Sequence, residues 1–399
     1  MDHTPAGSEH FWQYLIGEPS RQVRELLVST SILDFAMAAI TIFEPIYLYH
    51  LGFSIPRIIG FYLVIYFLYL AIQPLGGKIT RSQGYKHGII FSTPFLILYY
   101  LSLFAIPFSP LFIATAVIAL AIQKTLYWPG FHADFARFSS STTLGRELGV
   151  LVLLLSLSSV LGPVFGGLII KYWNFPTLFV IVALLILASN IPLLITPEVF
   201  TPRNLSYADA YKRALKPENR RFVVSFMGYG EELIAVTLWP LAIFLAIRHY
   251  ATMGTLVSAG MLFTALIGYL VGRRTDCSER NDLLKVGTLF TALSWLARVA
   301  VAGPFQILGI DALYRTARLA QGMPMISMTY DLAKRYSVTK TALLIEMSVI
   351  IGKLSLGIIA LLFFVFLPSR AWDLTFAFAA FWSLLYLIYR SPICPPKNG

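Results

Sequence analysis

The chain has 399 residues, of which 57% are hydrophobic and only 13% charged, with a mean hydropathy of +0.72 and a net charge of +11. Soluble globular chains carry roughly 25% charged residues, so this composition excludes a soluble protein and indicates an integral membrane protein. The apolar runs have the length of spanning helices, which excludes a barrel built from alternating segments of roughly ten residues.

Twelve apolar runs are long enough to cross a bilayer as helices. The first run has no small-residue cleavage site, so we expect a retained span and not a signal peptide. The predicted spans cover residues 29–51, 55–75, 88–106, 110–129, 148–170, 175–196, 222–247, 252–272, 285–303, 305–331, 339–367 and 371–389.

The basic residues predict how these spans are oriented. With both termini inside, 22 of the 31 lysines and arginines lie in cytoplasmic segments and 4 in outer loops. The positive-inside rule explains this asymmetry, so the net charge reflects membrane orientation and not nucleic-acid binding. We therefore expect a multi-pass protein of the plasma membrane whose N- and C-termini are cytoplasmic.

A basic stretch divides the chain into two halves. Residues 197–221 contain three prolines and six lysines or arginines, which is typical of a cytoplasmic linker near a membrane surface. The predicted organisation is a cytoplasmic segment 1–28, a six-helix bundle 29–196, the linker 197–221, a second six-helix bundle 222–389 and a cytoplasmic tail 390–399.

Two signatures recur at the same spacing in both halves. A basic, glycine-led turn is predicted at residues 76–87 and another at 272–280, and Gly77 and Gly272 are 195 residues apart. Pro129 and Pro324 are also 195 residues apart, and each precedes a span end that contains an acidic and a basic residue. Two repeats at one offset indicate a duplicated membrane bundle.

These features together resemble the major facilitator superfamily. The resemblance implies an all-α membrane protein with twelve transmembrane helices in two pseudo-symmetric six-helix bundles, working as a secondary transporter. Gly77, Gly84 and Lys86 match the family's gating turn. Arg81 stands where the family has an acid, whereas the second turn keeps an acid at Asp276.

The predicted span 148–170 carries a proline flanked by small residues. Small residues let helices approach closely, and proline frees backbone carbonyls. The pattern resembles the helix 5 motif of drug/proton antiporters, which implies efflux, although close helix packing alone would also explain it. The motif residues are Gly162, Pro163, Gly166 and Gly167.

Eleven charged residues are predicted inside spans, although each costs roughly 2.5–3.5 kcal/mol at the centre of a helix. Six are acidic and five basic, which indicates pairing around a water-filled cavity. Eight lie on predicted spans 1, 4, 7 and 10, which line the central cavity in the family that the chain resembles. The eleven are Asp34, Glu44, Lys124, Glu231, Glu232, Arg298, Asp311, Arg315, Arg318, Glu346 and Lys353.

The span 305–331 places three of these charges on one face. Asp311, Arg315 and Arg318 are spaced i, i+4 and i+7, so their side chains project in one direction. Because an arginine keeps its proton, it can act as a fixed cation that pairs with an anionic substrate or with a carboxylate that titrates. We expect Arg315 to pair with Glu231 or Glu232 as the coupling element, and a structural ion-pair network between the halves is the open alternative.

Two further spans supply candidates for substrate or proton binding. Glu231 and Glu232 point about 100° apart on their helix, so we expect only one of them to face the centre of the cavity. Glu44, which precedes Pro45, is the candidate of the first span, and Lys124 is that of the fourth.

Enzyme and metal chemistry find no support in the sequence. His132 lacks a partner at metal-ligand spacing, Cys277 and Cys394 form no framework, and no phosphate-binding G-x-x-x-x-G-K-[ST] occurs. We therefore expect no enzyme activity, metal or cofactor, and transport driven by an ion gradient. The expected partners are a small-molecule substrate, protons or another ion and the lipid bilayer, without nucleic acid, and the expected state is a monomer.

Two classes of function follow from these features. The first is a secondary active transporter that moves a small solute by alternating access, coupled to protons and acting in efflux of an amphiphilic or drug-like compound. The second is a non-transporting membrane sensor or scaffold with the same fold, which Arg81 in place of the family's acid favours.

Overall fold

The computed structural model describes residues 21–138, 144–195, 207–273, 280–301, 303–335 and 338–389, and their regular structure is entirely helical. The helices are α2 (Arg21–Ile40), α3 (Glu44–His50), α4 (Ile55–Gln83), α5 (Tyr85–Ala105), α6 (Leu111–Phe138), α7 (Leu144–Tyr172), α8 (Phe175–Ser189), α9 (Tyr207–Leu215), α10 (Arg220–Met227), α11 (Glu231–Ile247), α12 (Tyr250–Arg273), α13 (Arg280–Ala297), α14 (Pro304–Arg335), α15 (Val338–Phe366) and α16 (Ala371–Ser383). Short 3-10 turns are Pro192–Leu194, Pro217–Asn219, η3 (Gly228–Gly230), η4 (Arg298–Ala300), Pro368–Arg370 and Leu384–Ile388.

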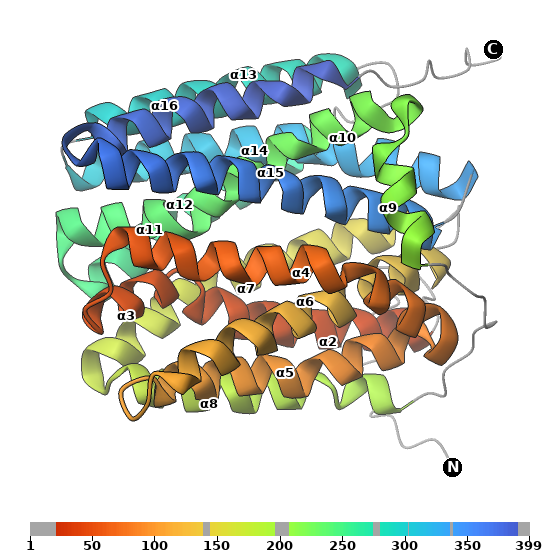
Figure 1. Cartoon of the computed structure of the whole chain (residues 1–399), viewed down its shortest axis with the longest axis horizontal. Helices are drawn as coiled ribbons and strands as arrows, with labels where there is room; N and C mark the ends of the chain where they lie inside the picture. Colours follow the sequence, from red (N-terminus) through yellow and green to blue (C-terminus); the bar gives the residue numbers. More distant parts are fainter. Residues whose placement is uncertain are drawn as a thin grey trace.

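The long helices lie side by side and run in roughly the same direction across the molecule (Figure 1). Those from α2 to α8 occupy one side and those from α10 to α16 the other, and α9, within the predicted linker 197–221, lies across one end. Across the division α7 packs against α12, α4 against α15 and α3 against α11. The predicted class of an all-helical membrane protein is confirmed, and the assignment to two pseudo-symmetric bundles of six stays a prediction.

Ten segments of the described residues are long and apolar enough to cross a membrane, and each coincides with a predicted span. The other two predicted spans, 252–272 and 305–331, lie within α12 and α14 and are not among the ten. For α14 the three charges that begin at Asp311 lower the hydropathy. The count of twelve spans therefore stays a prediction.

The predicted turn at residues 76–87 is wrong for most of its length. Helix α4 continues to Gln83, so Gly76 and Gly77 are helical, and the chain turns only at Gly84, whose φ of 110° favours glycine. Gly76 serves close packing instead, since a Cβ there would overlap the carbonyl oxygen of Thr125 in α6.

The other residues of the two turns have separate environments. Lys86 is buried and its Nζ lies 3.0 Å from Oε2 of Glu25 in α2, so this cation ties two helices together. Gly272 lies in the last turn of α12. The side chain of Arg81 and the whole of Asp276 lie outside the described part of the chain, so their gating role stays a prediction.

The glycines of the helix 5 motif lie where α7 meets two other helices. A Cβ on Gly162 would lie 2.5 Å from Cβ of Ala38 in α2, and one on Gly166 would overlap the carbonyl oxygen of Ala39. A Cβ on Gly167 would lie 2.8 Å from the carbonyl oxygen of Tyr250, which begins α12 on the other side of the bundle. The motif therefore fixes contacts both within one side and between the two.

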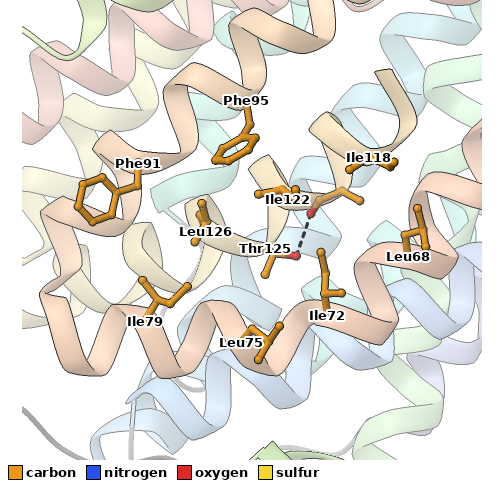
Figure 2. Close-up of a pocket in the computed structure, with 11 residues that line it drawn as sticks. Leu68, Ile72, Leu75, Ile79, Phe91, Phe95, Ile118, Ile122, Thr125 and Leu126 are labelled. Carbon is orange, nitrogen blue, oxygen red and sulfur yellow. Dashed lines mark hydrogen bonds between the residues drawn. The ribbon is translucent and has the colours of Figure 1, made fainter. Parts of the chain in front are cut away.

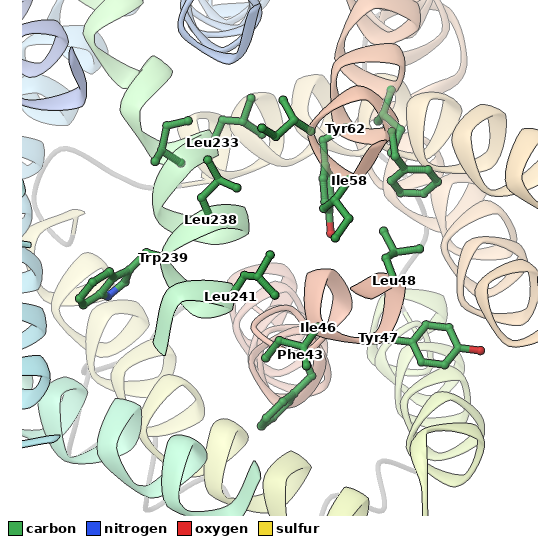
Figure 3. Close-up of a cluster of buried hydrophobic side chains, with 14 of the residues drawn as sticks. Phe43, Ile46, Tyr47, Leu48, Ile58, Tyr62, Leu233, Leu238, Trp239 and Leu241 are labelled. Atoms are coloured by element: carbon green, nitrogen blue, oxygen red, sulfur yellow. The ribbon is translucent and has the colours of Figure 1, made fainter. Parts of the chain in front are cut away.

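The apolar core also crosses between the two sides. Phe43, Ile46 and Leu48 lie at the break between α2 and α3 and within α3, and with Leu238 and Leu241 of α11 they belong to one fully buried cluster (Figure 3). Next to it, His50 of α3 contacts the rings of Phe175, Phe244 and Tyr250, and its Nε2 is hydrogen-bonded to the Tyr250 hydroxyl. Ring packing thus joins the two sides at the end opposite α9 (Figure 1).

We predict that Gly166→Ala destabilises the protein and that Gly60→Ala does not. Both changes add one methyl to a spanning helix and raise its helix propensity by about 1 kcal/mol. At Gly166 the methyl meets the backbone of Ala39, and such overpacking costs about 1–3 kcal/mol, whereas nothing lies within 4 Å of a Cβ at Gly60.

Thermal unfolding in detergent measures the difference. We expect a lower Tm for Gly166→Ala and an equal or higher Tm for Gly60→Ala, relative to the unchanged protein. Equal Tm values for the two variants would contradict the packing role of the motif.

Candidate functional site

Two spanning segments are interrupted immediately before a buried glutamate. Helix α2 ends at Ile40 and α3 begins at Glu44, while α10 gives way to the 3-10 turn η3 before α11 begins at Glu231. The side chains of Glu44 and Glu231 belong to residues 5% and 0% exposed. Each buried carboxylate must therefore find its hydrogen-bond donors inside the protein.

The carboxylate of Glu231 is surrounded by donors from two other helices. Its Oε2 accepts hydrogen bonds from Nε1 of Trp295 in α13, at 2.7 Å, and from the hydroxyl of Tyr314 in α14, at 2.8 Å. Its Oε1 forms an ion pair with the guanidinium of Arg318. Glu231 is the first residue of α11 and follows directly on η3.

Glu232 has a more open environment. Its side chain is 38% exposed, and its Oε2 lies 2.6 Å from Nζ of Lys353 in α15. Its Oε1 lies 3.5 Å from Arg318, whose guanidinium therefore bridges the two adjacent glutamates. Glu232 is therefore the more accessible of the two glutamates, and the expectation that only one of them faces the centre of the cavity stays a prediction.

The expected pairing of Arg315 with these glutamates is wrong. Nε of Arg315 lies 2.6 Å from Oδ2 of Asp311, its i,i+4 neighbour in α14. The other oxygen of Asp311 accepts a hydrogen bond from Nε1 of Trp239 at 3.0 Å. Because Arg315 is held on its own helix, Arg318, one turn further along α14, is the arginine that reaches Glu231 and Glu232.

Glu44 lies apart from this cluster. Its partners among the described residues are three hydroxyl groups: Tyr100 at 2.8 Å, Tyr99 at 2.9 Å and Tyr62 at 3.4 Å. Tyr62 belongs to α4, and Tyr99 and Tyr100 to α5. Neutral donors thus bond to the buried glutamate of the first side, on which Lys124 acts only through space, whereas a cation pairs directly with that of the second.

Two tyrosines of α4 connect the sides. The Tyr66 hydroxyl accepts a hydrogen bond from Nζ of Lys353 at 3.3 Å, and Nζ of Lys124 lies 5.7 Å from the Tyr66 ring centre. One turn further, the Tyr69 hydroxyl donates to Oε2 of Glu346 in α15 at 2.9 Å. The candidate Lys124 therefore approaches the charge cluster only through Tyr66.

The polar role of these tyrosines was missed in the sequence. The near-helical spacing of Tyr62, Tyr66 and Tyr69 is typical of core packing, and the hydroxyl partners lie on distant segments. Trp295 and Tyr314 carry no local sequence signal for binding a carboxylate. Their contribution follows only from the fold, which brings the two side chains to the start of α11.

One pocket lies elsewhere. It has a volume of about 540 Å³ and lies between α4, α5 and α6 (Figure 2). Its lining is apolar and includes the exposed side chains of Leu75, Phe91 and Ile118. The dashed line in Figure 2 is a bond within α6, from the Thr125 hydroxyl to the carbonyl of Ala121. With no charged group in its lining, this pocket is not the candidate site.

The charge cluster, in contrast, combines groups that chemistry can use. Within the described residues, Glu231, Glu232, Arg318 and Lys353 form two acids and two bases in mutual contact. No group of three His, Cys, Asp or Glu side chains suited to a metal ion occurs in the same part of the chain. The arrangement can exchange protons or bind an ionic group of a solute, and it offers no ligand set for a metal.

Comparisons with known proteins place the chain in a family. The model of the Major Facilitator Superfamily matches residues 26–247. A sequence comparison with curated proteins finds no match. Among solved structures, a POT family transporter in complex with 5-aminolevulinic acid has a TM-score of 0.73 at 13% identity, covering 93% of this chain and 96% of that one.

A second solved structure gives the same result. The peptide transporter POT in complex with sulfate has a TM-score of 0.70 at 13% identity, covering 93% of this chain and 94% of that one. At this level of identity the likeness shows the fold alone. The match of the family model over more than half of the residues shows that the chain belongs to the Major Facilitator Superfamily of secondary transporters.

Proposed function

We propose that the chain is a proton-coupled secondary transporter whose coupling site is formed by Glu231, Glu232, Arg318 and Lys353. One observation carries the proposal: Arg318 bridges two adjacent glutamates, of which one is fully buried and the other 38% exposed. Glu231 is held by Arg318 and two neutral donors, so it anchors the arginine. Glu232 is accessible to water and is the group that takes up the proton.

Protonation of Glu232 changes the charge balance of the site. Two acids and two bases are balanced when both glutamates are ionised, and mutual pairing offsets the cost of burying them. A proton on Glu232 leaves Arg318 and Lys353 with one ionised carboxylate in direct contact, while Glu346 acts on Lys353 only through space. The cluster then carries an excess positive charge, which favours binding of an anionic group of a substrate.

The same step reaches the contact between the two sides. Lys353 pairs with Glu232 and also donates to Tyr66 of α4. When Glu232 is neutral, Lys353 loses an ion-pair partner at 2.6 Å, so its position against Tyr66 is no longer fixed from both sides. Proton binding thereby acts on a contact that alternating access has to rearrange.

The proposed substrate is an amphiphilic, drug-like compound, and the proposed direction is efflux. The resemblance of Gly162, Pro163, Gly166 and Gly167 to the antiporter motif supports this choice. A second substrate class is a small solute with both a carboxylate and an amine. Its support is the accessible acid and base of the cluster, together with the complex of 5-aminolevulinic acid with a POT family transporter of the same fold.

Transport in proteoliposomes tests the function and separates the two substrate classes. With a pH-sensitive dye inside the vesicles, we expect a transported solute to produce a proton flux that empty liposomes lack. Lipophilic cations should produce it if the chain is an efflux antiporter, and 5-aminolevulinic acid or dipeptides if it transports zwitterions. Specific partner binding without any solute-dependent flux across the panel would support the sensor or scaffold function instead.

We predict that Glu232→Gln removes coupling to protons while solute exchange continues. Glutamine resembles the protonated glutamate, so the cluster can still bind substrate but no longer responds to pH. Accumulation driven by a pH gradient should fall to the level without a gradient, whereas exchange between equal solute concentrations should persist. Both rates are measured in proteoliposomes.

Glu44→Gln is the matched control, because it makes the same change at the other buried glutamate. We expect it to keep the response to a pH gradient, since Glu44 is held by neutral hydroxyls and not by a cation of the cluster. Retained coupling in Glu232→Gln together with lost coupling in Glu44→Gln would place the proton site at Glu44.

We also propose that the linker and both termini face the cytoplasm of a cell whose plasma membrane holds the protein. Single cysteines at positions 218 and 370 test this orientation after Cys277 and Cys394 are replaced by serine. Glu218 and Arg370 are both exposed, so each variant can react. An impermeant maleimide added to intact cells should label Arg370→Cys and spare Glu218→Cys, and the reverse pattern would overturn the orientation.

A further inference from the structure

A buried arginine lies behind the charge cluster, enclosed by aromatic rings. Arg298 belongs to η4 at the end of α13 and is 3% exposed. Its guanidinium carbon lies 3.8 Å from the ring centre of Trp295 and 4.3 Å from those of Trp239 and Tyr314. The ring faces stabilise the cation, and an arginine does not give up its proton in proteins.

The hydrogen-bond donors of this arginine are not used by the protein. None of its three side-chain nitrogens has a hydrogen-bond partner among the described residues. A guanidinium carries five N–H donors in its plane, and ring faces above them do not replace in-plane acceptors. Buried polar groups are nearly always satisfied, so these donors point to an acceptor that the chain itself does not provide.

The neighbouring carboxylate of Asp311 attracts Arg298 through space, but its single charge is shared with Arg315. Both oxygens of Asp311 are engaged, one by Nε1 of Trp239 at 3.0 Å and the other by Arg315 at 2.6 Å. Because Asp311 forms its ion pair with Arg315, Arg298 has no ion-pair partner among the described residues. Water would satisfy the N–H groups but would leave this positive charge in a low-dielectric environment.

We infer that Arg298 is the centre of a binding site for a small monovalent anion of the halide type, most simply chloride. Such an ion supplies both the missing acceptor and the missing negative charge. The site is closed to larger solutes from outside, because Trp295, Trp239 and Tyr314 are 0%, 4% and 7% exposed. The site is therefore distinct from the substrate site proposed at Glu232 and does not depend on it.

The site is nevertheless connected to Glu231 through the same side chains. Trp295 and Tyr314 present their ring faces to Arg298, and their Nε1 and hydroxyl groups donate to Oε2 of Glu231. An anion that holds Arg298 in place fixes the rings on which the Glu231 carboxylate depends. Anion binding should therefore stabilise this part of the fold.

Thermal unfolding with exchanged anions is the first test. The purified protein is unfolded in increasing sodium chloride, with sodium gluconate replacing it at constant ionic strength. A ligand that binds only the folded state raises the Tm with its concentration, so we expect a saturable rise of about 2 °C or more with chloride. An equal Tm in chloride and gluconate would overturn the inference.

Arg298→Gln should abolish this chloride dependence, whereas Arg370→Gln, the same change at an exposed arginine, should keep it. A chloride dependence that persists in Arg298→Gln would place the anion elsewhere and overturn the inference.

Bromide quenching of tryptophan fluorescence locates the anion even if Arg298→Gln does not fold. Bromide bound beside Arg298 should quench the adjacent indoles at a saturating concentration, in addition to collisional quenching of exposed ones. Trp295→Phe keeps an aromatic face there but removes the nearest fluorophore, so the saturable quenching should fall by roughly half. Trp372→Phe, at a ring that packs on Phe364, is the control and should retain it. Equal amplitudes in the two variants would overturn the assignment.

Discussion

The ion pairs of Arg318 with Glu231 and Glu232 are the interaction on which the interior of the bundle depends. Charges inside a membrane-spanning bundle are costly, and they persist when each finds an opposite partner and enough donors. Arg318 meets this requirement for two glutamates at once, and Lys353 supplies a second cation to Glu232. Both glutamates stand at the start of α11, directly after η3.

The two sides of the bundle solve the problem of a buried glutamate differently. Glu44 is held by three tyrosine hydroxyls, whereas Glu231 is held by an arginine, a tryptophan and a tyrosine. Neutral donors stabilise a carboxylate without fixing its charge state, since a protonated carboxyl can also bond to hydroxyls. When the partner is a cation, a change in the charge of the carboxylate removes the attraction that holds the cation in its position. In the proposed mechanism, the second arrangement lets a change of charge act on the position of a neighbouring side chain.

The sequence predicts the helices and the charged residues of this site well, and it predicts the pairs between them poorly. Apolar length identifies each described span, and the cost of a buried charge singles out Glu231, Glu232 and Arg318. The predicted partner of Arg315 was wrong because Asp311, at i,i+4 on the same helix, forms the ion pair with it instead. The turn expected at Gly76 was wrong for a related reason, because glycine in a membrane helix also serves close packing, here against Thr125.

Contacts between the two sides are of two kinds, close backbone packing at glycines and hydrogen bonds between side chains. Gly167 and Gly254 bring α7 and α12 together backbone to backbone, with the carbonyl oxygens of Tyr250 and Pro163 facing them, and such packing tolerates rotation better than separation. Along α4 and α15 the contacts include side-chain hydrogen bonds, from Lys353 to Tyr66 and from Tyr69 to Glu346. Hydrogen bonds of this kind exchange readily for bonds to water when a cavity opens. The glycine contact between α7 and α12 is therefore suited to act as a pivot. The hydrogen-bonded contact between α4 and α15 is suited to respond to charge, because its Lys353 also pairs with Glu232.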